Sequence, residues 1–191
     1  MEAGVERSRS LVLRSGGLED ARNLAERNGW QRVDSGERDA WALWRIGDRA
    51  YFCYALAQAC GERVCYFYGP DKREVDALFD RYADGVDAWT LDELLVRSPD
   101  EPASPATRLR EVLRLGLGAP RECSLPFLRY LWIASRHDNE IVRGAVPQAA
   151  FYMRWPALRR LLRDLSRLDR SPRVRELARL VLEEINRRPR F

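Results

Sequence analysis

The amino-acid sequence predicts an α+β chain: a small α-β-β-β-α module with an antiparallel meander, followed by a C-terminal α-helical array. Aromatic and β-branched residues gather in three short runs between residues 40 and 68, and glycine-containing turns separate these runs. From residue 106 onward, apolar residues recur instead at steps of three and four. Prolines between the two regions mark a linker at 98–105, which leaves a module at 11–97 and an array at 106–191.

Outside the meander, the module is predicted to hold a strand at 11–13, a helix at 18–28, a polar loop at 34–39 and a helix at 71–85. Asn28 and Gly29 favour a left-handed end to the first helix, and we expect Trp30 to cover that end. The side chain of Asp71 can cap the second helix. Thr90 predicts a further capped helix through residue 96.

The meander is predicted as strands at 40–46, 49–59 and 63–68. Gly47-Asp48 and Gly61-Glu62 fit two-residue type II′ turns, because glycine readily adopts the positive φ of the first turn position. A two-residue turn at Gly47-Asp48 places Trp44 opposite Tyr51. Aromatic pairs of this kind stabilise a sheet, so the pairing supports the predicted meander.

The C-terminal array is predicted as five helices at 106–117, 124–135, 139–153, 156–167 and 172–187. Pro147 falls inside the third helix and predicts a kink there. Val142-Arg143 and Val174-Arg175 lie 32 residues apart, and a fainter copy, Leu109-Arg110, lies 33 residues before the first. Three spaced copies of one pattern predict a helical repeat array.

These repeats resemble short HEAT repeats over roughly residues 104–187. The resemblance implies a scaffold for binding whose concave face is lined by the first, third and fifth helices. It also implies that the repeated arginine is tied to the aspartate of the loop before it, within or between repeats. Asp138, Arg143, Asp169 and Arg175 are therefore expected to be structural repeat positions.

Charge is distributed unevenly along the chain. From residue 100 onward there are 19 arginines and 11 acidic residues, whereas the first 99 residues hold 14 basic and 18 acidic residues. The basic half makes nucleic-acid binding the alternative function, although acidic residues interrupt its basic runs. Arginines and aromatic residues are also favoured at protein interfaces. The candidate partner-binding residues are Arg108, Arg114, Tyr152, Arg154, Trp155, Arg173 and Arg179.

No pattern of catalytic, cofactor-binding or metal-binding residues is predicted. His137 is the only histidine, and the four cysteines contain no C-x-x-C pair, so zinc or nucleophilic chemistry lacks its usual partners. No apolar run approaches the roughly 20 residues that a membrane-spanning helix needs. The charged start of the chain lacks the apolar core of a signal peptide, so we expect a cytoplasmic protein.

The sequence therefore predicts a non-enzymatic protein–protein binding module with no cofactor. Its resemblance to compact bacterial HEAT proteins implies an adaptor or an immunity protein, which would inhibit a partner by occluding its active site. The partner is expected to be another protein held by the array, by the sheet face or by an exposed outer strand of the meander. The oligomeric state is left open.

Overall fold

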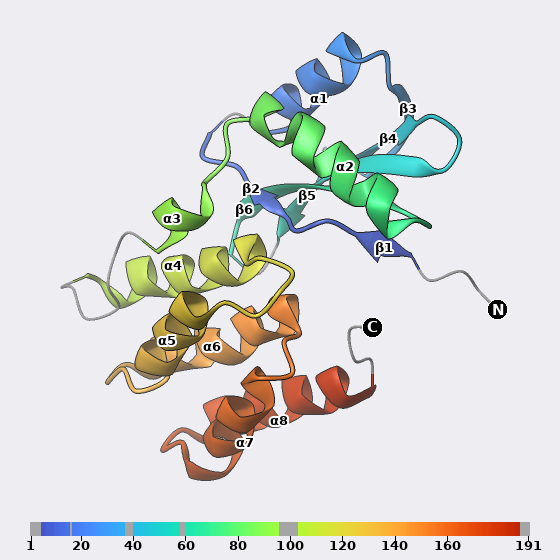
Figure 1. The fold of residues 1–191 in the computed structure, drawn as a ribbon. Helices are drawn as coiled ribbons and strands as arrows, with labels where there is room; N and C mark the ends of the chain where they lie inside the picture. Colours follow the sequence, from blue (N-terminus) through green and yellow to red (C-terminus); the bar gives the residue numbers. More distant parts are fainter. Residues whose placement is uncertain (1–4, 16, 37–39, 58–59, 96–102, 188–191) are drawn as a thin grey trace. The chain divides into compact units, whose positions relative to one another are not determined.

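The computed structural model describes residues 5–15, 17–36, 40–57, 60–95 and 103–187 of the chain. It confirms the predicted α+β class, with an antiparallel sheet and two long helices followed by an all-helical region (Figure 1). The chain divides into two compact units, Met1–Trp89 and Thr90–Phe191, called here the sheet unit and the helical unit. Most of the predicted linker at 98–105 lies outside the described residues.

In the described part of the sheet unit, six strands pair in the order β1-β6-β5-β4-β3, with β2 also pairing β6. The strands are β1 (Glu6–Arg7), β2 (Leu11–Val12), β3 (Gln31–Ser35), β4 (Trp41–Ile46), β5 (Ala50–Ala57) and β6 (Glu62–Gly69). The predicted meander is confirmed as β4, β5 and β6, and the predicted N-terminal strand as β2. Neither outer strand of the meander is an open edge, because β3 covers β4, and β1 and β2 cover β6.

The predicted register of the first hairpin is wrong by one residue. The turn contains Gly47, Asp48 and Arg49, with Gly47 at a φ of 58°, so it is three residues long rather than two. Trp44 therefore pairs with Phe52 and not with Tyr51. Both side chains are buried, with ring centroids 5.6 Å apart. A slip of one residue would turn this pair to opposite faces of the sheet, so burial of the two rings fixes the register.

Two further sequence predictions in the sheet unit are corrected. The predicted turn at Gly61-Glu62 fails because Glu62 is already in β6, opposite Ala57. The polar loop was predicted to start at Asp34, but Asp34 and Ser35 belong to β3. This strand was not predicted from the sequence. All five residues of β3 are exposed, and its sequence, QRVDS, has a single apolar residue. The strand therefore lacks the alternation of apolar and polar residues by which strands are predicted. Its pairing with β4 shifts register between Arg32 and Asp34.

One face of the sheet carries the core of this unit. Helices α1 (Leu18–Arg27) and α2 (Lys72–Tyr82) both pack there, and a 3₁₀ turn, η2 (Ala83–Gly85), follows α2. The left-handed end of α1 is confirmed, since Gly29 has a φ of 67°. The Trp30 ring packs against the sheet and α2, 5.3 Å from the ring of Phe52 and 4.9 Å from that of Tyr82, and its expected position over the end of α1 stays a prediction. The predicted caps at Asp71 and Thr90 are also confirmed.

The helical unit contains the short helix α3 (Leu91–Leu94) and the five predicted helices: α4 (Pro105–Gly118), α5 (Leu125–Ala134), α6 (Glu140–Met153), α7 (Leu158–Leu168) and α8 (Pro172–Arg187). Pro147 lies inside α6, which runs on to Met153; the predicted kink stays a prediction. Helices α4, α6 and α8 pack in series and form one row, while α5 and α7 form a second row (Figure 1).

The first row is closely packed because its helices carry small residues at their contacts. A Cβ atom added at Gly116 of α4 would lie 2.6 Å from the Cα of Ala149 in α6. The two helix backbones therefore approach too closely for a side chain at this position. By contrast, a Cβ at Gly144 would meet only Val174 at 3.8 Å, which is an ordinary contact.

We expect Gly116→Ala to lower the free energy of unfolding by about 1–3 kcal/mol, because the extra methyl group forces α4 and α6 apart. Gly144→Ala is the matched control. It should raise the free energy of unfolding by up to about 1 kcal/mol, since alanine favours the helix and no clash opposes it. Urea unfolding followed by circular dichroism measures both changes. Equal effects of the two substitutions would show that the close approach of α4 and α6 at Gly116 does not exclude a side chain.

Candidate functional site

Large apolar side chains are exposed on the second row of helices. Leu125 and Trp132 of α5 are 78% and 52% exposed, and Leu168 of α7 is 79% exposed. All three line one groove. Isolated exposed apolar residues are common on protein surfaces, but several around one groove mark an interaction site.

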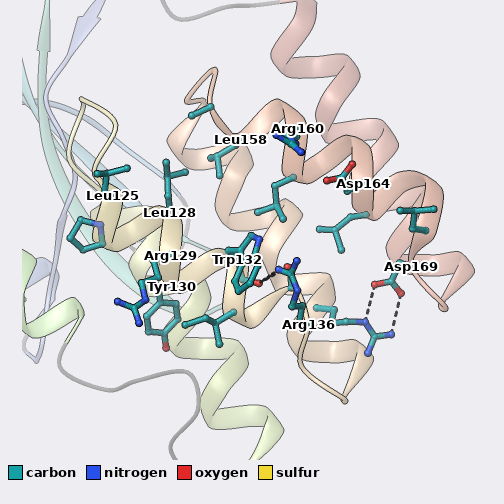
Figure 2. Close-up of a pocket in the computed structure, with 18 of the residues that line it drawn as sticks. Leu125, Leu128, Arg129, Tyr130, Trp132, Arg136, Leu158, Arg160, Asp164 and Asp169 are labelled. Carbon is teal, nitrogen blue, oxygen red and sulfur yellow. Dashed lines mark hydrogen bonds and ion pairs between the residues drawn. The ribbon is translucent and has the colours of Figure 1, made fainter.

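The groove lies between α5 and α7 and has a volume of about 1400 Å³. Figure 2 shows Leu125 and Leu158 toward one end of it and Arg136 and Asp169 toward the other. On α5, Leu128 and Trp132 are four residues apart, which places them on the same helix face. The wall on α7 is a similar stripe of Leu161, Leu165 and Leu168. Each wall is thus an apolar helix face with no helix packed over it within the groove.

The rim of the groove is mostly basic. Four exposed arginines line it: Arg129, Arg136, Arg160 and Arg170. The guanidinium carbon of Arg136 lies 3.3 Å from the centroid of the Trp132 ring, a cation–π contact that also holds the indole in place. Among the described residues that line the groove, Asp164 and Asp169 are the acidic ones. Asp169 is already bound to Arg143, and Arg170 is bound to Asp138. Positive charge still prevails at the rim, because Arg129, Arg136 and Arg160 stand against Asp164.

Arg143 and Asp169 form a buried ion pair at one end of the groove. Their side chains are 5% and 3% exposed, and Nε of Arg143 donates to Oδ2 of Asp169 at 2.8 Å. A second nitrogen of Arg143 donates to the other carboxylate oxygen at 3.1 Å, so the contact is bidentate. Nη1 of Arg143 also donates to the backbone carbonyls of His137 and Asp138, at 2.9 and 2.8 Å. This one side chain therefore joins two loops of the helical unit.

The bonds of Arg143 recur at the equivalent position of the next repeat. Nη1 of Arg175 donates at 2.7 Å to the carbonyl of Asp169, six residues earlier, just as Arg143 does to His137. The carboxylate of Asp138 lies 3.4 Å from the guanidinium of Arg170 at the surface. Arg143 thus pairs with the aspartate of the following loop, and not with that of the loop before it. The third sequence copy differs, because Arg110 is exposed.

The pKa of Asp169 is shifted by opposing causes. Burial raises it, but hydrogen bonds from Arg143 and from the Ser171 amide outweigh burial, so the pKa lies below its ordinary value. A lowered folded-state pKa means that the carboxylate stabilises the fold above its unfolded pKa of about 3.9, and that this contribution is lost as pH falls through the folded value.

We therefore expect the stability difference between wild type and Asp169→Asn to be largest near neutral pH and to shrink below about pH 4. Urea unfolding from pH 7 to pH 3 measures it, and a constant difference would contradict the assignment.

Two of the predicted partner-binding residues are buried. Arg108 is 1% exposed, and its Nη1 donates to Glu111 at 2.7 Å and to the Tyr130 hydroxyl at 3.3 Å. Trp155 is also 1% exposed, and its indole N–H donates to the carbonyls of Pro120 and Arg121, each at 3.2 Å. The prediction that these side chains contact a partner is corrected, because both belong to the interior of the helical unit.

Two aromatic residues, Phe151 and Tyr152, lie side by side near the end of α6. Phe151 is exposed, whereas Tyr152, one of the predicted partner-binding residues, is half-buried against it with ring centroids 5.8 Å apart. Arg154 ends the helix with a φ of 52°, and its guanidinium lies 5.2 Å from the Phe151 ring. Tyr152 is therefore not the exposed aromatic residue of this segment.

The remaining predicted partner-binding residues lie outside the groove. Arg114 is half-buried on α4, and Arg173 is exposed on α8. Arg179 is exposed too, but it is bound to Glu176 and Glu183 on the same helix. Sequence reasoning missed the groove although α5 carried a signal. Its segment Leu125–Ala134 holds a single charged residue, Arg129, which is unexpected for a helix in an outer row.

A smaller hollow of about 610 Å³ lies on the sheet unit, lined in part by Trp41, Leu43 and Tyr66. The guanidinium of Arg7 covers Tyr66 at 3.5 Å from the ring centroid. The groove of the helical unit is larger and its leucines are more exposed, so we take it as the candidate site. Across the described ranges, no three His, Cys, Asp or Glu side chains are grouped to hold a metal ion.

Comparisons of the chain with protein-family models, with curated proteins and with solved structures found no match. In the parts of the chain that the structure describes, no helix is both long enough and apolar enough to cross a membrane.

Proposed function

We propose that this protein is a non-enzymatic protein-binding module, and that its helical unit holds a segment of another protein between α5 and α7. The observation that carries the proposal is the exposure of Leu125, Trp132 and Leu168 around one groove. At about 1400 Å³ the groove exceeds the roughly 300–1,000 Å³ of ordinary small-molecule sites. An adaptor, or an immunity protein that occludes its partner, fits this arrangement.

A short HEAT-like array is part of the same proposal. It is supported by the row of α4, α6 and α8 and by the repeated bonds of Arg143 and Arg175 to the loop six residues before each. However, the proposed binding face is formed by other helices than the sequence predicted. The sequence pointed to the first, third and fifth helices, whereas the groove is lined chiefly by the second and fourth, α5 and α7.

Nucleic-acid binding is the second candidate, and the arginines at the groove rim favour it. Two observations weigh against it. Asp164 shares the groove with these arginines, and on α8 the charge of Arg179 is compensated by Glu176 and Glu183. Binding to a phosphate backbone would fall steeply with salt, whereas binding through apolar contacts would not.

Affinity capture from native lysate, with and without nuclease, tests the proposal. We expect a stoichiometric protein partner that survives nuclease and is lost with Trp132→Asp. The control is Leu180→Asp on α8, which alters an exposed leucine outside the groove and should keep the partner. Loss of all captured material on nuclease treatment would instead establish the nucleic-acid alternative. A partner retained by Trp132→Asp would place the binding surface elsewhere.

A further inference from the structure

We infer that the groove between α5 and α7 binds an acidic amphipathic α-helix of about three turns from the partner protein. This inference rests on the proposed function and specifies its ligand. It follows from the backbone of the groove walls, from the spacing of their side chains and from the charge of the rim.

The backbone of the walls excludes an added β-strand as the mode of binding. Both walls are helices, whose backbone groups are bonded within the helix. Even at the end of α5, the carbonyl of Trp132 accepts from the Ser135 hydroxyl at 2.7 Å and from Arg136 at 3.2 Å. The groove therefore offers a bound chain few backbone partners. A segment buried there must satisfy its own N–H and C=O groups, and a helix does so.

The dimensions of the walls fix the length of the bound helix. Helices α5 and α7 have 10 and 11 residues, which correspond to roughly 15 Å at about 1.5 Å per residue. A helix lying along them would contact both walls over about three turns. The stripes of Leu128 and Trp132 on one side and of Leu161, Leu165 and Leu168 on the other are ridges at helical spacing. Their complement is a helix with apolar residues at positions i, i+3 or i+4, and i+7.

The rim selects an acidic helix. Arg129 and Arg160 stand exposed on opposite walls, and Arg136 and Arg170 are exposed at the end where α5 and α7 finish. Arginine binds carboxylates in a bidentate geometry, so glutamates or aspartates flanking the apolar stripe would be paired on both sides. A helix flanked by lysines would meet like charges at the same positions.

The charge argument also disfavours a second copy of this chain as the occupant. The most evident amphipathic helix of the helical unit, α7, has its polar face made of Arg159, Arg160, Arg163 and Arg167 together with Asp164. Its two fully buried leucines, Leu158 and Leu162, already pack within the unit. A like-charged helix is a poor match for a basic rim.

The experiment places a photo-crosslinking amino acid at Leu161 in the full chain, activates it in nuclease-treated native lysate, and sequences the crosslinked segment by mass spectrometry. The same label at Leu180 on α8 is the control. We expect one protein to be crosslinked from position 161 and not from 180. Its crosslinked segment should combine the apolar spacing above with a clear excess of acidic residues.

A synthetic peptide of that segment then tests the mode of binding. It should gain helical circular dichroism on binding the full-length protein, and Arg129→Glu with Arg160→Glu should weaken binding at least about tenfold. Arg173→Glu, an exposed charge outside the groove, should leave the affinity unchanged. A segment that is basic or stays extended, or a crosslink to a second copy of this chain, would overturn the inference. Absence of any crosslinked protein would overturn the proposed function as well, so the two failures are distinct.

Discussion

Arg143→Ala is expected to lower the free energy of unfolding of the helical unit by about 3–5 kcal/mol. The substitution leaves the carboxylate of Asp169 buried without its bidentate partner. The carbonyl of His137 also loses the donor Arg143, whereas the carbonyl of Asp138 keeps Arg170 as a donor. A buried charge without a partner is much more costly than the ion pair itself is stabilising. Urea unfolding followed by circular dichroism at 222 nm measures the loss.

Arg170→Ala is the matched control for this prediction. Arg170 comes directly after Asp169 in the same loop, but its ion pair with Asp138 is exposed. Exposed pairs contribute roughly 0–1 kcal/mol. If the two alanine variants lose similar stability, burial of the Arg143–Asp169 pair is not the cause, and its role in joining the two loops is wrong.

Trp155→Ala is expected to be as damaging, with a loss of about 3–5 kcal/mol. Trp155 fills the space beside Phe127, with ring centroids 6.3 Å apart, and its indole N–H holds the loop between α4 and α5 through Pro120 and Arg121. The alanine variant leaves a cavity and removes the donor to both carbonyls. Thermal and urea unfolding both report the change.

A second substitution separates these two contributions. Trp155→Phe keeps much of the ring but removes the N–H donor, so we expect a smaller loss of about 1–3 kcal/mol. Trp132→Ala removes a tryptophan of the same size from the surface and should cost much less than Trp155→Ala, because about half of its side chain is already in water. Equal losses from the two tryptophan-to-alanine variants would contradict the assignment of Trp155 to the core.

The helices were predictable from the sequence because their ends are encoded locally. Ser104 accepts a hydrogen bond from the Thr107 amide, and Asn139 accepts one from the Ile141 amide, as capping residues do. Such signals lie within three residues of the helix start and need no knowledge of the rest of the fold. The same reasoning located Thr90 as the cap of α3.

The sheet register was harder to predict from the sequence, because it depends on contacts between strands. A two-residue turn at Gly47 is compatible with the local sequence, but burial of Trp44 against Phe52 requires a third turn residue. Strand β3 was missed for a related reason. Its exposed residues carry no periodic signal, and only its pairing with β4 makes it a strand.

The candidate site could be predicted least of all. In the sequence Arg108 resembles Arg173, yet Arg108 is buried because Tyr130, from another helix, supplies a hydrogen-bond partner 22 residues away. In the same way, nothing local distinguishes Leu168 from the buried Leu165 three residues earlier in α7. Which arginine is buried and which leucine is exposed is decided by packing between helices.

The edge strand β3 has a consequence for how the protein behaves at high concentration. Unpaired sheet edges are templates on which native proteins aggregate by adding strands from other molecules. In β3 the register shift between Arg32 and Asp34 interrupts the regular row of donors and acceptors, and charged side chains stand on either side of it. Such an edge resists intermolecular strand addition. Self-association through β3 is therefore disfavoured.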